Sequence, residues 1–429
     1  MSTDAALDTR IDDIVSLSRE LTEGDTLIKG QIRLYDVESG DALESNARRF
    51  FDRTLLTQGL EDSLKRLRDT LNGEDNVRIH EMYGPYGTGK SHQMVALYHC
   101  FESPATVAQW ADGRIEGLAE ALPTDALPVV LSLQKEQYDY LWEPLFEALD
   151  YDLSAADYDE EGGYPTIDVI ADAVGDRTVA FFVDELEDFF DSLTGRRKAA
   201  NKGFLQALFE TSTRPDTELF SIVSVLREES DVHDILSRQE RVEVNMSNQV
   251  SIREVLRHRL VEGIDDESRL QSLVESYVEA YAETDYVDLP AGFREELHET
   301  YPFHPELVSA LKTRYFAETE SGATRGMLYL FAKLLVDKHD ETDLLTHGEV
   351  DAVDYNDELG RINVEHHRPD RCFDDIRERL DGTGIDYGRQ ILSTVLIYSL
   401  TPGLDEGATT SDIVVGTFHA GDRVNDIVV

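Results

Sequence analysis

The chain has 429 residues, of which 41 % are hydrophobic, and 87 acidic against 40 basic side chains give a formal net charge of −47 at pH 7. This hydrophobic content excludes a disordered acidic polymer, and no apolar run approaches the about 20 residues of a membrane span. Two cysteines are too few for a disulfide framework or a zinc site, and the N-terminal MSTDAALDTR holds no apolar signal region. We therefore expect a cytoplasmic protein.

The acidic residues are spread along the chain rather than gathered in one tail. Molar salt shortens the Debye length to about 3 Å and makes such self-repulsion tolerable. We expect a halophilic protein, with an ordinary acidic protein as the alternative. The charge does not exclude a nucleic acid partner, because a local basic strip is compatible with it.

In chain order, residues 1–39 are expected to form an N-terminal helical extension. Over residues 40–248, short apolar runs alternate with helical patterns. Strands are expected at 77–83, 128–133, 179–183, 219–226 and 241–245. The main helices are expected at 48–71, 91–101, 138–149 and 198–211. This alternation predicts an α/β domain with a parallel sheet covered by helices on both faces.

Beyond residue 249 the pattern is helical. Helices are expected at 252–261, 269–282, 292–300, 304–316 and 325–339. We expect an all-helical domain over 249–342 and a partial helical or winged-helix-like domain over 343–429. Because the chain stops on an apolar run directly after a turn, we expect this last domain to be unfinished.

A glycine-rich segment follows the first predicted strand: Gly84-Pro85-Tyr86-Gly87-Thr88-Gly89-Lys90-Ser91. It fits the pattern G-x-x-x-x-G-K-[ST] at each fixed position, and a predicted helix follows it. Glycines let successive backbone N–H groups point at a phosphate, and the start of the helix adds its positive end. Lys90 would reach the β- and γ-phosphates of ATP, and the Ser91 hydroxyl would hold Mg²⁺.

Carboxylates follow the predicted strand at 179–183. Ligands bind at the carboxyl edge of open α/β sheets, so Asp184 is expected to complete the Mg²⁺ shell. Glu185 is expected to orient and deprotonate the attacking water, with a surface acidic turn as the alternative. Glu187 and Asp188 are interpreted as a solvated helix start.

Several polar residues have two interpretations. Ser224, or its strand neighbour Ser221, would sense the γ-phosphate or simply bond backbone within a buried strand. Arg227 is a phosphate sensor, an arginine finger or a surface ion pair. His92 directly follows the loop; we place it at the nucleotide, although packing beside the loop explains it equally well.

Two basic groups also stand out in this acidic chain. They would contact DNA phosphates or a neighbouring subunit, or lie on ordinary solvated helix faces. The groups are Arg196-Arg197-Lys198 and the set Arg253, Arg257, His258 and Arg259.

Residues 84–92 resemble the phosphate loop of large P-loop ATPases encoded in phage-defence islands. These include the BREX phage-exclusion ATPase and related ATPases encoded beside DNA methyltransferases, and they are similar to AAA+ ATPases. Further segments carry the resemblance, which covers about residues 40–420: FFDRTLLTQGL at 50–60, YPFHPEL at 301–307, TRG at 324–326 and the region 407–416.

The resemblance implies an AAA+-like fold with a helical lid, in which Arg325 is the lid arginine and residues 54–60 line the adenine pocket. It also implies a motor or switch subunit of an anti-phage defence or DNA-modification complex. The partners it implies are a second copy of the chain, another subunit of the complex, DNA or a DNA methyltransferase. Family members are commonly much longer, so we expect this chain to be truncated.

Together, these features predict a Mg²⁺-dependent ATPase that binds ATP between the α/β domain and the lid. One alternative is a nucleotide-gated, initiator-like DNA-binding protein. Another is a scaffold that binds ATP without hydrolysing it, and a third is a decaying or split gene product.

Overall fold

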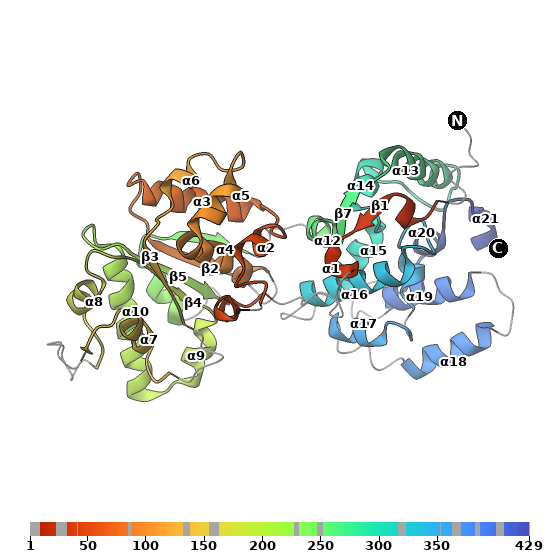
Figure 1. The fold of residues 1–429 in the computed structure, drawn as a ribbon. Coiled ribbons are helices and arrows are strands. Elements are labelled where there is room, and N and C mark those ends of the chain that lie inside the picture. The colour runs from red at the N-terminus through yellow and green to blue at the C-terminus, as the bar shows by residue number, and fades with distance from the viewer. Residues whose placement is uncertain are drawn as a thin grey trace. The chain divides into compact units, whose positions relative to one another are not determined.

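The structure is a computed structural model. It describes residues 9–22, 32–40, 42–84, 88–131, 138–153, 163–226, 231–246, 252–315, 323–351, 353–362, 370–381, 387–399 and 407–428. The chain divides into two compact units, of which the first is 32–250 and the second combines 1–31 with 251–429. Figure 1 shows both units and labels most of their elements.

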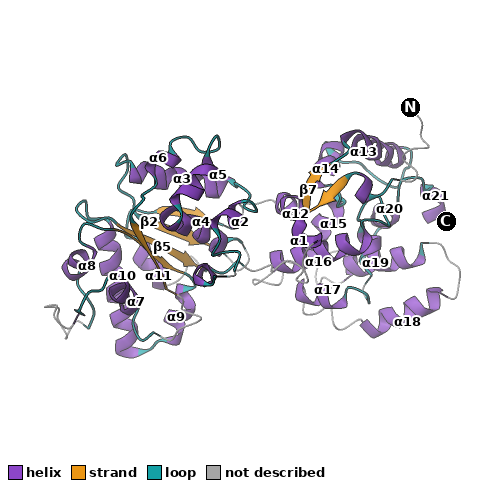
Figure 2. Cartoon of the chain, viewed as in Figure 1, coloured by secondary structure: helices purple, strands orange, loops and turns teal. Residues whose placement is uncertain are grey.

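A five-stranded parallel sheet organises the first unit (Figure 2). Its order is β3-β4-β5-β2-β6. The strands are β2 (Ile79–Tyr83), β3 (Ala126–Leu131), β4 (Thr178–Val183), β5 (Leu219–Val225) and β6 (Val242–Asn245). All five strands lie within two residues of their predicted positions, so the predicted parallel α/β sheet is confirmed.

Helices cover both faces of this sheet (Figure 1). Successive strand residues point to opposite faces, and Phe181 and Phe182 of β4 accordingly belong to different hydrophobic clusters. One face is covered by the 3₁₀ helix Leu34–Glu38, α2 (Ala47–Phe51), α3 (Gln58–Leu71), α4 (Lys90–Glu102), α5 (Pro104–Ala111) and α6 (Leu118–Ala121). The other is covered by α7 (Trp142–Ala148), α8 (Ile167–Val174), α9 (Leu186–Ser192), α10 (Gly195–Ser212) and α11 (Asp231–Leu236).

The second unit is mainly helical. Its first elements are the 3₁₀ helix Ile11–Asp13, β1 (Val15–Leu17) and α1 (Arg19–Thr22). It resumes with α12 (Ile252–Leu260), β7 (Val261–Ile264), α13 (Glu267–Ala282), α14 (Phe293–Thr300), α15 (Pro305–Ala310), the π-helix Leu311–Tyr315 and α16 (Ala323–Lys338). It continues with the 3₁₀ helix His347–Glu349, α17 (Asn356–Ile362), α18 (Asp370–Asp381), α19 (Gly388–Ser399), α20 (Thr410–Thr417) and α21 (Val424–Val428).

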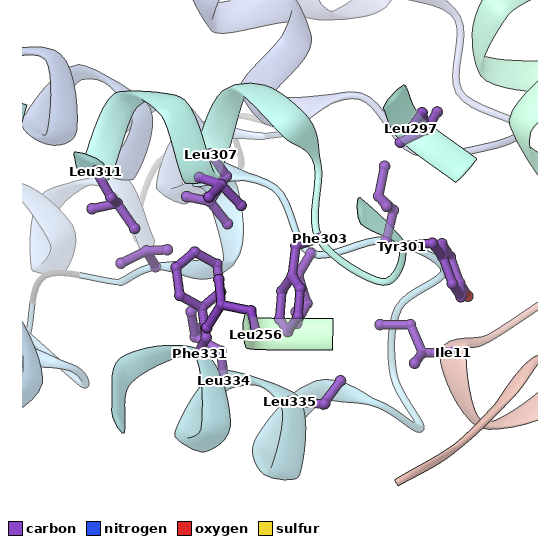
Figure 3. Packing of buried hydrophobic residues seen from close by; sticks show 14 of the residues in the cluster. Ile11, Leu256, Leu297, Tyr301, Phe303, Leu307, Leu311, Phe331, Leu334 and Leu335 are labelled. Carbon is purple, nitrogen blue, oxygen red and sulfur yellow. The ribbon is translucent and has the colours of Figure 1, made fainter. Parts of the chain in front are cut away.

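One hydrophobic core joins most of these elements, although α18 and the 3₁₀ helix His347–Glu349 contribute no described residue to it. Figure 3 shows part of it: Phe303 packs against Phe331, and Ile11 from the N-terminal segment lies near Tyr301. Residues on both sides of the expected boundary at 343 contribute to this core. The described part of 343–429 consists of helices and irregular segments, so the winged-helix-like domain stays a prediction.

The N-terminal segment differs from the expected helical extension over 1–39. β1 pairs antiparallel with β7, with Val15 opposite Ile264, and Ile11 and Ile14 are buried in the second unit's core. Local periodicity does not reveal a pairing between such distant segments. Within the described residues, no helix combines the length and apolar composition needed to cross a membrane.

Candidate functional site

The candidate site begins where β2 gives way to α4. The Gly84 N–H donates to Val225 O at 3.1 Å, which ties the start of the glycine-rich loop to the end of β5. Gly84 has φ 147° and Gly89 has φ 97°, a backbone region that side chains with a Cβ disfavour. The chain thus needs glycine at both positions to turn from strand into helix. Pro85, Tyr86 and Gly87 lie outside the described residues, and Thr88 and Gly89 lead into α4.

Lys90 is the first residue of α4 and is only 6 % exposed. Its Nζ donates to Gly84 O at 2.5 Å, so the ammonium folds back over the loop. The positive end of the helix and the ammonium charge therefore coincide. This combination favours phosphate groups.

Ser91 and Asp184 meet although they are far apart in sequence. Ser91 Oγ donates to Asp184 Oδ2 at 2.7 Å, and Ser224 Oγ donates to the other carboxylate oxygen, Oδ1. Hydroxyls from α4 and β5 thus fix the carboxylate that follows β4. Ser224, the candidate sensor, lies at this edge and bonds Asp184 and the backbone of Glu185; its role at the γ-phosphate stays a prediction.

These oxygen atoms fit a magnesium ion. Mg²⁺ prefers hard oxygen donors and is usually held by only one or two protein groups together with water and phosphate oxygens. Ser91 Oγ and the Asp184 carboxylate supply such donors. Among the described residues, no group of three or more His, Cys, Asp and Glu side chains has the arrangement of a metal centre. Water and phosphate oxygens would therefore supply the remaining ligands of a Mg²⁺ ion held by Ser91 and Asp184.

Glu185 has an unusual backbone conformation. It is the N-cap of α9 with φ 58° and ψ 42°, the left-handed region. For a residue with a Cβ, this conformation is destabilising by roughly 1–2 kcal/mol. Such strained backbone conformations concentrate at functional sites. The Glu185 N–H donates to Ser224 Oγ at 3.0 Å, which helps to hold this conformation.

The interpretation of Glu187 as solvated is wrong. Glu187 is 7 % exposed and accepts a hydrogen bond from the Leu226 N–H, whereas its neighbour Asp188 is exposed. The apolar face of α9 turns Glu187 inward together with Leu186 and Phe189. The helical spacing of the buried residues of α9 was the available signal in the sequence, but the neighbouring acidic residues obscure it.

His92 lies between the loop and an earlier segment of the chain. Its Nε2 is 3.1 Å from Thr54 Oγ1, and its ring centroid is 4.6 Å from that of Phe50. Because the Thr54 hydroxyl donates to Phe50 O at 2.8 Å, His92 Nε2 is the donor to Thr54. Residues 54–60 therefore begin beside the first turn of α4, and their role at adenine stays a prediction.

A buried ionic cluster surrounds Glu81 of β2, a residue that was not among the predicted candidates. The side chain of Glu81 in β2 is fully buried. Its Oε1 lies 2.9 Å from Nδ1 of His233 in α11, and its Oε2 pairs with Arg241, which directly precedes β6. Removing one partner of a buried ion pair leaves an uncompensated charge. The available signal in the sequence was the polar residues His80 and Glu81 within the otherwise apolar strand β2.

Three further candidates are Arg325, Arg227 and Ser221. Arg325 lies in the first turn of α16, in the second unit, and its side chain is outside the described residues. Arg227 is also outside them. Ser221 shares a hydrogen bond of 2.8 Å with Ser212 and is buried, which matches the strand-serine alternative.

The basic groups have local partners. Arg197 pairs with Asp139 at 2.9 Å at the start of α10. Arg253 pairs with Glu296, and Arg257 donates to Glu299 O at 3.0 Å. These contacts agree with the solvated-face alternative.

Comparisons with known proteins match two parts of the chain. The DUF499 N-terminal domain matches residues 25–123, and the DUF499 second domain matches residues 247–354. The first match includes β2, the glycine-rich loop and α4, and the second includes α12 to α16. Asp184, Glu185 and Ser224 lie outside both.

A solved structure, described as the crystal structure of the FIGL-1 AAA domain in complex with ADP, aligns at 14 % identity. The alignment covers 73 % of this chain and 79 % of that chain with a TM-score of 0.24. A likeness at that level supports no conclusion about this chain. A comparison with curated proteins gives no match.

Proposed function

We propose that this chain binds ATP with Mg²⁺ and hydrolyses it as an AAA+-like ATPase. The observation that carries the proposal is the hydrogen bond of 2.7 Å between Ser91 Oγ and Asp184 Oδ2. It joins the two halves of the predicted phosphate site. β5 lies between β4 and β2 in the sheet, so direct strand pairing does not impose this contact.

The groups of the chain have separate tasks in the proposed reaction. Lys90 and the start of α4 bind the β- and γ-phosphate oxygens. Ser91 and Asp184 would hold Mg²⁺, whose charge when bound stabilises the negative phosphate oxygens. Glu185 accepts a proton from water while the water oxygen bonds to the γ-phosphorus, and the bond to the ADP oxygen breaks. Positioning and charge supply most of the rate in such reactions.

Two variants test these assignments. Glu185→Gln keeps the shape of the side chain but lacks a base, so we expect ATP binding to remain and phosphate release to fall by at least about a hundredfold. Lys90→Ala removes the ammonium beside the loop, so we expect ATP binding itself to weaken. Unchanged phosphate release in Glu185→Gln would refute its role as the base, and unchanged binding in Lys90→Ala would refute the site.

From the resemblance alone, we further propose that ATP turnover works as a motor or switch in an anti-phage defence or DNA-modification complex in the cytoplasm. Arg325 of the helical lid would contact the nucleotide, and the complex partner would be a second copy, DNA or a DNA methyltransferase. Duplex DNA that leaves phosphate release unchanged, together with an Arg325→Ala variant of wild-type activity, would contradict the DNA and lid-arginine parts.

A further inference from the structure

We propose that Glu187 is a positioning residue that holds the end of β5 against both the glycine-rich loop and Glu185. This inference rests on the proposed ATPase function for its effect on turnover. Its structural part concerns one peptide group, the C=O of Val225 and the N–H of Leu226, and is independent of that function.

This peptide group is bonded on both sides. Its N–H donates to the Glu187 carboxylate from α9, and its C=O accepts from the Gly84 N–H, the first residue of the loop, at 3.1 Å. Hydrogen bonds in a chain polarise one another. Glu187 is therefore linked through a single peptide to the start of the phosphate loop.

The same bond lies two residues beyond Ser224, at the end of β5. The backbone pairing of β4 with β5 ends at Val183 and Val223. Beyond that point, side chains connect the two strand ends: the Ser224 hydroxyl bonds Asp184 and the Glu185 N–H, and Glu187 bonds Leu226. Without Glu187, the last residues of β5 lose one of these connections.

The burial of Glu187 indicates that this residue serves to position the end of β5 rather than to fill space in the core. It lies on the face of α9 that also buries Leu186, Phe189 and Phe190, where an apolar side chain would pack well. A buried carboxylate destabilises a protein unless it is hydrogen-bonded. The hydrogen bond to Leu226 compensates for this burial and fixes the edge of the sheet where Asp184 and Glu185 lie.

A matched pair of variants tests the proposal. In Glu187→Gln the amide oxygen still accepts from Leu226, while Glu187→Met fills a similar volume without a comparable acceptor. Asp188→Ala, on the exposed side of α9, is the control. We expect Glu187→Met to lower kcat by about 10- to 100-fold, because small misplacements of catalytic groups have effects of that size. KM should stay within about threefold, and the Gln variant and the control should stay near wild type.

Amide hydrogen exchange of the full chain provides a readout that needs no turnover. We expect the Leu226 and Gly84 amides to exchange faster in Glu187→Met and at the wild-type rate in Glu187→Gln. Equal exchange in both variants would overturn the proposal, as would a kcat in Glu187→Met equal to that of the control. Wild-type protein with no phosphate release above Lys90→Ala would instead refute the ATPase function, and the exchange result would still decide the structural part.

Discussion

Glycine and alanine at position 185 separate backbone strain from chemistry. Both substitutions remove the proposed catalytic carboxylate, but only glycine also removes the Cβ that disfavours φ 58°. Relief of the left-handed conformation is worth roughly 1–2 kcal/mol, and the larger entropy of glycine in the unfolded chain offsets about 0.4–1 kcal/mol of it. We expect Glu185→Gly to be more stable than Glu185→Ala by about 1 kcal/mol.

Urea unfolding of the two variants measures this difference, and thermal unfolding should show a midpoint about 2–4 °C higher for the glycine variant. Both variants should release phosphate no faster than Lys90→Ala. A Glu185→Ala protein as stable as Glu185→Gly would refute the strained conformation. Wild-type phosphate release in either variant would refute the catalytic role of the carboxylate.

Three further predictions concern the metal and the pH dependence of stability. Ser91→Ala removes one oxygen ligand and should raise the Mg²⁺ concentration for half-maximal phosphate release about tenfold, the effect of about 1.4 kcal/mol; an unchanged Mg²⁺ titration would contradict this role. Burial lowers the pKa of His80 from 6.5 to about 4, so the unfolded state binds the proton first and stability falls as the pH drops from about 6.5 towards 4, by at most about 3 kcal/mol. His80→Leu should flatten that part of the stability–pH curve, and an unaltered slope would contradict it. Burial opposes the charged form of His419, but Glu349 and Asp343 outweigh burial and raise its pKa well above 6.5, so its stabilisation is complete below 6.5 and is lost as the pH rises through the folded-state pKa; His419→Asn should remove this alkaline loss, and a persisting loss would point to other groups.

The His419 prediction also follows from geometry. Nδ1 lies 2.6 Å from Asp343 Oδ1, and Nε2 lies 2.9 Å from Glu349 Oε1. A carboxylate accepts hydrogen bonds, so both ring nitrogens must donate, and only the charged imidazolium can do so. This bonding connects the turn after α20 with the segment that follows α16.

The parallel sheet could be predicted from the sequence because its evidence is local. β4 reads as a continuous apolar run, as strands buried on both faces do, and helical patterns separate the strands. The glycine-rich loop and its lysine were equally visible, since a phosphate site needs these residue types in a short stretch. Asp184 and Glu185 were placed because acidic residues directly follow an apolar strand.

What the sequence did not reveal depends on contacts between distant segments. β1 has three residues and exists through its pairing with β7, which no local pattern records. The pairing of Glu81 with Arg241 depends on β2 and β6 being neighbours in the sheet. Glu187 was misinterpreted because its burial depends on which face of α9 meets β5.

Phosphate release from ATP with Mg²⁺ in about molar KCl, compared between the wild type and Lys90→Ala, tests the central claim most directly. The high salt screens the large negative charge of the chain. The account predicts turnover in the wild type and none above background in Lys90→Ala. Equal phosphate release by the two proteins would contradict it, as would a wild-type protein that neither binds nor hydrolyses ATP.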